Sequence, residues 1–487
     1  MIDLVIILLY LGAMIGIGFY AKAKARTESD FLVAGRRLGP FYYAGTLAAL
    51  VMGGGATLGG IGIGYQKGLA GVWIAFSFGI GVTVISLLLA PLINRLKVYT
   101  VSQMLEVRYG NMGTVMSGVV MLGYTLFISV TSTIAYGAIF SVLLDIDKIP
   151  AILIGSSVVV LYSVLGGMWS ITLTDMVQFI VKTISIFFVL LPLALFRAGG
   201  IDGLVEKLPE TAFSWGDSRF IFTYMLLYVP TMVIGQDLWQ RVFTARSDKV
   251  ARWAGVTAAL YCFAYGLAGA LIGMAAATLI PGLETRDEVY TQVVRTVLPV
   301  GLAGFVVAGA LAAIMGTSSG ALIATATVAK QDIVGGLRRR RQVAPAGDTQ
   351  AVAHGGHGHD EVRDNRVLIV IFGVIMAGIA CAVNDVVGAL TLASAFLVSG
   401  LMVPVLGGFI WKRATARGAV ASIVAGVVFT VGTMIVLGDI FSNVPIYAGV
   451  LASLVAFVAV SLFDAPTPAG VMRNWEQRIA PGSADAD

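Results

Sequence analysis

Apolar runs long enough to cross a lipid bilayer recur along almost the whole chain. A membrane-spanning helix needs about 20 mainly apolar residues. Apolar windows between glycine, proline and charged residues predict thirteen spans, at about 2–20, 40–65, 69–93, 115–143, 149–170, 173–196, 218–243, 251–280, 295–332, 367–383, 386–411, 416–437 and 444–463. With 58% hydrophobic and 12% charged residues, the chain has too little polar surface for a soluble fold. The sequence therefore predicts an all-α membrane protein in a lipid bilayer, with no nucleic-acid partner.

The lysine and arginine residues orient these spans. With the N-terminus outside, most of the 32 lysines and arginines fall on the inner side, including the run Arg338–Arg341. Cytoplasmic segments carry such an excess of positive charge. We therefore expect a multi-pass protein of the inner cell membrane with its N-terminus outside and its C-terminus in the cytoplasm. The first run, 2–20, lacks a basic start and a cleavage site, so we expect it to be a retained helix.

A single transmembrane domain is expected over residues 1–465, followed by a cytoplasmic tail at 466–487. The segment 333–366 is rich in arginine and histidine and is predicted to be a cytoplasmic loop. A short histidine-rich tract can bind a metal, and a flexible linker explains these residues as well. The histidines concerned are His354, His357 and His359.

Two spans carry backbone breaks that lipid-facing helices avoid. The second contains three consecutive glycines, Gly53–Gly55, and each costs about 1 kcal/mol relative to alanine in a helix. The seventh contains Pro230, which removes a backbone donor, and Gly235 a turn later. Broken backbone at membrane depth is tolerated where it lines a cavity or is buried in protein.

The positions of the two breaks predict an inverted repeat. The second and seventh spans are five helices apart, and because five is odd, two consecutive five-helix units cross the membrane in opposite directions. We expect these core repeats at about 40–196 and 218–411. Paired interrupted helices in such repeats point to a binding site near the middle of the membrane. For any single glycine, close helix packing through small residues is the alternative explanation.

Several segments together resemble one transporter family. The stretch Gly166–Gln178 resembles the GG…TDxxQ signature of sodium:solute symporters. Three further segments, Gly35–Phe41, Gln236–Arg241 and Ala312–Thr317, are similar to the start of that family's first core helix, the end of its sixth and its eighth. The resemblance implies a leucine-transporter-type core of five plus five helices, in spans 2 to 11. It also implies a sodium-coupled symporter that imports a small organic solute by alternating access.

The resemblance further implies a sodium site between spans 2 and 9. The matching positions are the backbone of Ala49, Met52 and Ala313 and the residues Gly316 and Thr317. The family usually places two adjacent hydroxyl residues here, and Gly316 stands where the first is expected. The ligand set is therefore one side-chain oxygen short, and Ser318 or water is the candidate to complete it. This gap leaves proton coupling on the same scaffold open as an alternative.

Three polar residues share one face of the sixth span, because helix positions three and seven apart recur on the same side. They are Asp175, Gln178 and Lys182. The resemblance implies that Asp175 helps to release the cation toward the cytoplasm. A charged lysine in a span costs about 3 kcal/mol, so we expect Lys182 to lean back toward Asp175. That contact would be either a structural tether bridged by Gln178 or part of the mechanism that couples cation and solute transport. In the seventh span, Asp237 is predicted to form a local ion pair with Arg241.

The same motifs place the solute against spans 2 and 7. The positions expected to contact it are mostly small and apolar: Val51, Gly53, Gly54, Gly55, Ala56, Tyr228, Thr231, Met232, Gly235 and Gln236. Sugar-carrying members present amides and carboxylates there, which argues against a sugar. The glycine run most resembles the choline-carrying branch, although Gly235 stands where that branch has a tryptophan of its aromatic cage. An amine, a quaternary ammonium and a carboxylate all stay open as solutes.

Other classes of function lack support in the sequence. A membrane sensor or channel would need an output domain or a continuous polar pore, and neither is visible. An enzyme would need a catalytic constellation or metal ligands beside the spans, and none stands out. We therefore expect a transporter without enzymatic activity that functions as a monomer, with sodium as the only bound metal.

Overall fold

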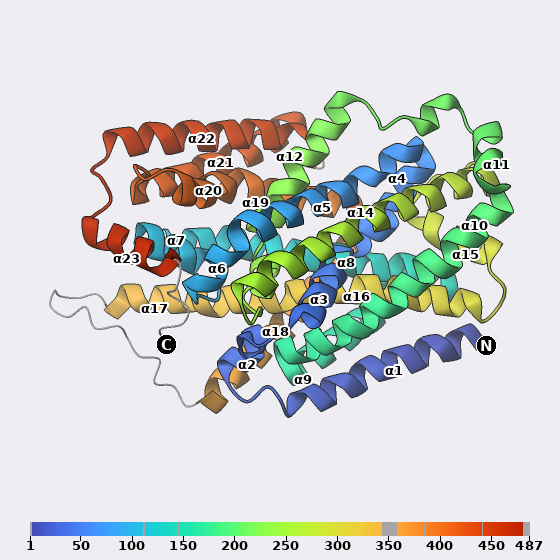
Figure 1. The fold of residues 1–487 in the computed structure, drawn as a ribbon, viewed down its shortest axis with the longest axis horizontal. Helices are drawn as coiled ribbons and strands as arrows, with labels where there is room; N and C mark the ends of the chain where they lie inside the picture. The colour runs from blue at the N-terminus through green and yellow to red at the C-terminus, as the bar shows by residue number, and fades with distance from the viewer. Residues whose placement is uncertain are drawn as a thin grey trace.

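The chain folds into a bundle of α-helices, as the computed structural model shows (Figure 1). The structure describes residues 2–110, 113–144, 146–342, 358–383, 385–440 and 442–480. Within these ranges the one pairing of extended backbone is an isolated bridge between Leu38 and Ala245. The prediction of an all-α protein is confirmed.

The helices follow the apolar runs closely. In the first half they are α1 (Ile2–Lys22), α2 (Glu28–Val33), α3 (Pro40–Val51), α4 (Gly60–Lys67), α5 (Trp73–Val84), α6 (Ala90–Leu96), α7 (Val101–Tyr109), α8 (Thr114–Leu144), α9 (Lys148–Thr183), α10 (Leu191–Ala198) and α11 (Gly200–Lys207). In the second half they are α12 (Ser218–Ile234), α13 (Gln236–Val242), α14 (Asp248–Leu279), α15 (Val289–Val297), α16 (Leu302–Val328), α17 (Gly335–Gln342), α18 (Gly358–Ala382), α19 (Val386–Leu397), α20 (Val403–Ile410), α21 (Ala416–Leu437), α22 (Val444–Phe463) and α23 (Ala469–Ile479).

Short helical segments of other pitch join several of these helices. The π-helical ones are η2 (Gly55–Gly59), η4 (Ile85–Leu89), η5 (Ile184–Leu190), η8 (Ala329–Val334) and η9 (Val398–Met402). The 3-10 helices are η1 (Ala34–Arg36), η3 (Gly68–Val72), η6 (Glu210–Phe213) and η7 (Arg286–Glu288). In the bundle, α1 lies along α9 at one edge, and α21 packs against α22 at the opposite edge (Figure 1).

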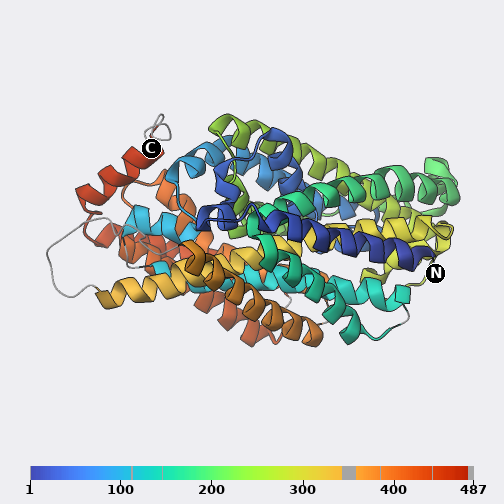
Figure 2. The same cartoon turned by 90° about the horizontal axis from the view of Figure 1, so that it is seen from below.

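Membrane crossings account for most of the helical residues. Among the residues described, ten helical stretches are long and apolar enough to cross a bilayer, or eleven if the bent pair at α12 and α13 is one span. Two of the ten, Gly55–Leu96 and Lys148–Ala198, have 42 and 51 residues, more than one crossing of about 20 residues needs. The start of α1 and helix α23 lie at opposite ends of the molecule (Figure 2). The count of thirteen stays a prediction.

A sharp turn at Gly167 divides α9. The φ of Gly167 is 54°, in the region that favours glycine, and a Cβ added there would lie 2.5 Å from the Phe31 carbonyl oxygen. This position therefore has no room for a side chain. We predicted the boundary between spans 149–170 and 173–196 at 170–173. The structure places it earlier, at Gly167, because this is the one residue of α9 with non-helical backbone angles.

The ninth predicted span also differs in its limits. Instead of one helix over 295–332, the short α15 is followed by α16, which begins at Leu302 and continues through η8 and α17 to Gln342. The first part of the expected loop 333–366 is thus helical, and α18 begins at Gly358. His354 and His357 lie outside the described residues, as does the side chain of His359.

The tail contains a docked helix. In α23, Trp475 is buried, and its ring centroid lies 5.2 Å from that of Phe409 in α20. This helix packs against α6 and α7, so part of the tail predicted at 466–487 belongs to the folded body.

Candidate functional site

Both predicted interruptions are present in the structure. Helix α3 ends at Val51, and Met52 leaves the helical conformation with φ −89° and ψ 66° before the chain continues into η2. Between α12 and α13, Gly235 is extended, with φ −64° and ψ 131°, and the two helices meet at a bend of 44°. Pro230 lies inside α12 without ending it. The second break therefore depends on Gly235.

A small cavity lies between the two interrupted spans. Its volume is about 30 Å³, which is room for one water molecule. The broken spans contribute Leu50, Val51, Gly53, Gly55, Ala56, Met232, Asp237 and Leu238 to its wall, and α5, α8, α16 and α19 contribute Phe78, Tyr124, Ile128, Thr131, Ser132, Thr317 and Leu390. The two breaks thus face each other across one site.

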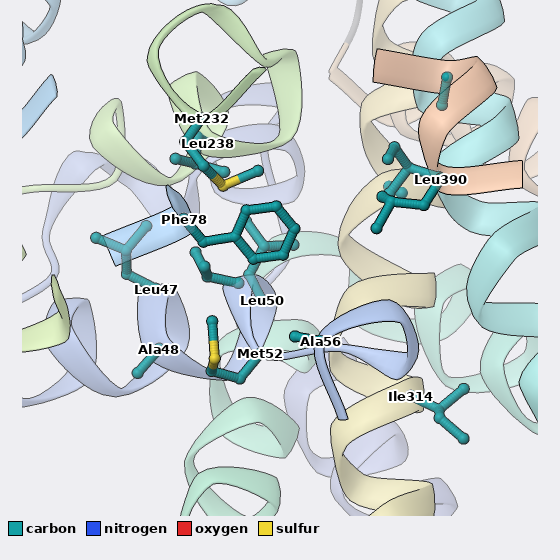
Figure 3. Close-up of a cluster of buried hydrophobic side chains, with 14 of the residues drawn as sticks. Leu47, Ala48, Leu50, Met52, Ala56, Phe78, Met232, Leu238, Ile314 and Leu390 are labelled. Atoms are coloured by element: carbon teal, nitrogen blue, oxygen red, sulfur yellow. The ribbon is translucent and has the colours of Figure 1, made fainter. Parts of the chain in front are cut away.

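Most of the cavity wall is apolar. Figure 3 shows the Phe78 ring between Met232 and Leu50, with Leu238 and Leu390 nearby. The Phe78 ring also meets Tyr228 edge to face, at 5.3 Å between ring centroids. A Cβ at Gly53 would overlap the Thr317 side chain, so the glycine lets the broken backbone approach α16 closely.

Half of the residues predicted to contact the solute line this cavity, namely Val51, Gly53, Gly55, Ala56 and Met232. The other predicted residues make contacts outside the cavity wall. Tyr228 faces Thr391, at 3.3 Å between their hydroxyl oxygens. The Thr231 hydroxyl donates to Leu227 O in its own helix. Gly54 is packed near Ala135, and Gly235 forms the bend itself.

Gln236 connects the break in the seventh span to α7. Its Oε1 accepts from the backbone N–H of Val101, and its Nε2 donates to the carbonyl of Tyr99, each at 2.8 Å. Both ends of the amide are therefore satisfied by backbone. This contact positions the half-helix α13 and does not place Gln236 against the cavity.

Several wall residues were missed in the sequence because they lie outside the broken spans. Phe78 and Leu390 are ordinary apolar residues of apolar helices and carry no local signal. The hydroxyl residues of α8 did carry one. Four hydroxyl side chains fall within the five positions 129–133 of an otherwise apolar span, and two of them, Thr131 and Ser132, line the cavity.

A lysine ammonium fills the cluster of carbonyl oxygens at the first break. Lys182 Nζ donates to Ala48 O, Ala49 O and Met52 O at 3.0, 3.1 and 3.2 Å, and the side chain is fully buried. The three donors of the ammonium thus have three acceptors. The expected contact between Lys182 and Asp175 is not formed, because the free carbonyls of the broken helix accept the hydrogen bonds of the ammonium instead.

Asp175 is paired with a residue of the other broken span. Arg241 Nη2 lies 3.0 Å from Asp175 Oδ2, and neither side chain is exposed. The Thr46 hydroxyl donates to the same carboxylate oxygen. The predicted local pair of Asp237 and Arg241 is therefore wrong: Arg241 reaches across to α9, and Asp237 Oδ1 accepts from the Tyr124 hydroxyl at 3.0 Å.

The residues predicted on the ninth span divide between two sides of α16. Thr317 faces the broken helix and donates its hydroxyl to Leu50 O. A Cβ at Gly316 would lie 3.0 Å from Gln178 Oε1, 3.2 Å from Ala49 O and 3.4 Å from Asp175 Oδ1, so Gly316 borders the same cluster. Ser318 faces Met376 of α18 and is not part of it. Ala313 is buried in α16 one turn before Thr317.

Gln178 does not bridge Asp175 and Lys182. Its Nε2 lies 3.8 Å from Met14 Sδ, and its Oε1 is buried without a hydrogen-bond partner in the described structure, as is Asp175 Oδ1. Both oxygens border the space beside Gly316. The missing hydroxyl thus leaves two acceptors unsatisfied next to the lysine-filled cluster.

Comparison with known proteins gives a consistent result. The model of the sodium:solute symporter family matches residues 31–426. The high-affinity proline transporter PutP of Bacillus subtilis is 25% identical over 94% of this chain and 97% of its own length. The sodium/glucose cotransporter of Vibrio parahaemolyticus is 24% identical over 88% of this chain and 84% of its own. A Na+-coupled sialic acid symporter, solved with substrate in an outward-open state, superposes with a TM-score of 0.81 over 96% of this chain and 98% of that one, at 18% identity.

Proposed function

This chain belongs to the sodium:solute symporter family and is a sodium-coupled symporter of a small organic solute, and we propose that the solute carries an ammonium group and binds in the cavity between the two interrupted spans. The fold is the family's inverted five-plus-five core, with sodium as the co-transported ion. The relatives are transporters, and nothing in their functions points to catalysis.

The charge of the cavity wall carries the proposal for the solute. Among the described residues that line the cavity, Asp237 is the one charged side chain. It is almost fully buried and accepts a hydrogen bond from Tyr124. A buried carboxylate attracts a cationic group of a solute and opposes an anionic one. We therefore favour an amine or amino acid over a simple carboxylate.

The rest of the wall fits the body of such a solute. Phe78, Met232, Leu238 and Leu390 supply apolar contact area, while the hydroxyls of Thr131, Ser132 and Tyr124 offer a few hydrogen bonds (Figure 3). Ligand sites typically combine an apolar lining with a small number of polar groups that fix orientation. Proline, named for the Bacillus subtilis relative PutP, combines an ammonium group with an apolar ring and is one member of the proposed class.

The cavity is small in this conformation. A volume of about 30 Å³ is too small for an amino acid, so loading requires the walls to separate. In transporters with inverted repeats, one bundle rocks or opens against the other around a fixed midplane site. We propose that the bends at Met52 and Gly235 move relative to each other in this step.

We further propose an inner-membrane location with the N-terminus outside and the C-terminus in the cytoplasm. Two observations support this orientation: the excess of lysine and arginine on the predicted inner side, and the position of α23 opposite the start of α1 (Figure 2). We also propose that a single chain is the transporting unit.

A ligand screen followed by an uptake assay tests the proposal. Purified protein is subjected to a thermal-shift screen against amines, amino acids, quaternary ammonium compounds and carboxylates, in sodium and in potassium. We expect the hits to carry an ammonium group and to need sodium. Each hit is then tested for uptake into liposomes under an imposed sodium gradient. Hits confined to carboxylates that lack an amine would rule out the proposed solute class while leaving sodium symport intact.

A further inference from the structure

The carbonyl cluster at the first break already contains a cation that belongs to the protein. Lys182 Nζ lies within 3.2 Å of the carbonyl oxygens of Ala48, Ala49 and Met52, and its side chain has no exposure to solvent. The rings of Tyr261 and Tyr265 also face it, each at 5.9 Å from Nζ to the ring centroid. The ammonium is therefore enclosed by acceptors and aromatic faces.

The oxygens that hold Lys182 are the ones a sodium ion would use here. Two of the three, Ala49 O and Met52 O, belong to the cation site that the family resemblance implies, and unwound carbonyls of this kind coordinate sodium in related folds. A sodium ion bound to them would lie within a few ångströms of a positive charge that is shielded by little solvent. One set of carbonyls cannot hold both cations.

The surroundings favour the lysine over a free ion. The family resemblance implies two adjacent hydroxyl ligands for sodium here, and Gly316 removes one of them, which leaves the Thr317 hydroxyl of that pair. Asp175, the carboxylate on the same face of α9, is paired with Arg241 at 3.0 Å, so it does not draw Lys182 away from the broken helix. The acceptors of Lys182 are backbone carbonyl oxygens, so a side-chain substitution at Ala48, Ala49 or Met52 would not remove them.

We propose that Lys182 is the resident cation of this site: its ammonium stands in for a sodium ion at the first break and excludes sodium from the carbonyls of Ala49 and Met52. The coupling sodium of this symporter then binds there only when the ammonium has left those carbonyls. This inference builds on the sodium symport described above, but it does not depend on the identity of the solute.

Sodium binding without solute tests the inference directly. Radioactive sodium is titrated onto the purified full chain, as wild-type, Lys182→Gln and Lys182→Met. A site that is blocked most of the time shows an apparent affinity reduced by the fraction of time it is free. We expect both variants to bind sodium at least about tenfold more tightly than the wild-type protein, or to bind one more ion per chain.

Two controls separate exclusion by the ammonium from a general effect of removing a lysine. Lys67→Gln removes another lysine that lies over an aromatic ring, 4.7 Å from the Phe220 centroid, at a distance from the cluster, and should bind sodium like wild-type. Lys182→Arg keeps a cation and should gain no sodium affinity. Thermal stability is measured in parallel, and sodium, unlike potassium, should restore stability lost in Lys182→Gln.

The contrary outcomes are clear. Wild-type affinity and stoichiometry in folded Lys182→Gln and Lys182→Met would overturn the inference. A second result would also overturn it: both variants unfold in sodium as well as in potassium, while Lys182→Arg stays folded. Sodium would then have failed to replace the ammonium. Neither result would affect the solute screen, so the proposed solute class and the role of Lys182 are tested separately.

Discussion

The Arg241 guanidinium of α13 lies 3.0 Å from the Asp175 carboxylate of α9, and neither side chain is exposed to solvent. This pair joins the half-helix that follows the second break to the helix that carries Lys182. Removing one partner of a buried pair leaves an uncompensated charge, at a cost of about 3 to 5 kcal/mol. We predict that Arg241→Gln strongly lowers thermal stability, measured in detergent. Arg246→Gln, at an exposed position soon after α13, is the control and should melt like wild-type.

Asp175→Asn should affect turnover more than binding. The amide keeps an acceptor for Thr46 and Arg241 but removes the negative charge that faces the cation region beside Gly316. Because it also leaves the buried Arg241 charge uncompensated, uptake is compared per amount of folded protein. Since Asp175 does not line the solute cavity, we expect solute affinity to change by less than about threefold while the maximum rate of uptake falls by about tenfold or more. Equal losses in binding and rate would argue against this separation.

The turn at Gly167 is expected to tolerate no side chain. Its positive φ disfavours other residues, and a Cβ there would lie 2.5 Å from Phe31 O. We predict that Gly167→Ala destabilises the fold by at least about 1 to 3 kcal/mol, seen as a lower melting temperature and lower yield of folded protein. Gly378→Ala is the matched control, because it lies in α18 with nothing within 4 Å of the added methyl. It should be neutral or slightly stabilising.

The sequence predicted the general architecture because long apolar runs, backbone breakers and charge bias are local signals. The breaks near Gly53 and Gly235 were predicted since glycine runs and proline in a span are visible without any partner. The sequence could not show which side chain would bind a free backbone carbonyl or pair with a buried charge. Lys182 and Asp175 lie seven positions apart on one helix, yet each is satisfied by a residue more than 60 positions away.

The same limit applies to the ion pair and the cavity. Arg241 is four positions from Asp237, which is ordinary spacing for a helical pair, but its guanidinium is directed toward Asp175 across the interface with α9. Phe78 and Leu390 belong to helices that look like any other apolar span. Only the packing of α5 and α19 against the broken helices shows that they line the site.

Thr317→Ala should raise the sodium concentration needed for uptake. The Thr317 hydroxyl donates to Leu50 O at the end of α3 and is the side-chain oxygen of α16 nearest the first break. Its loss leaves that carbonyl without this donor and loosens the contact between α16 and the broken helix, at a cost of about 1 kcal/mol or more. We expect the sodium dependence of uptake to shift by about fivefold or more. Thr325→Ala removes a hydroxyl of the same helix that bonds only its own backbone, at Ala321 O, and should leave the sodium dependence unchanged.

Asp237→Asn tests the charge that selects the solute. If an ammonium group faces this carboxylate, the amide variant keeps the hydrogen bond from Tyr124 but loses the charge, and solute affinity should fall by about tenfold or more. The solute is taken from the thermal-shift screen, and its affinity is measured by competition binding at saturating sodium. Tyr124→Phe serves as the companion variant: it removes the hydrogen bond without changing the charge, so its effect on affinity should be clearly smaller. If a solute binds Asp237→Asn as tightly as wild-type, no ammonium group of that solute contacts Asp237. Removing the charge of a buried carboxylate that pairs with a cation would weaken binding.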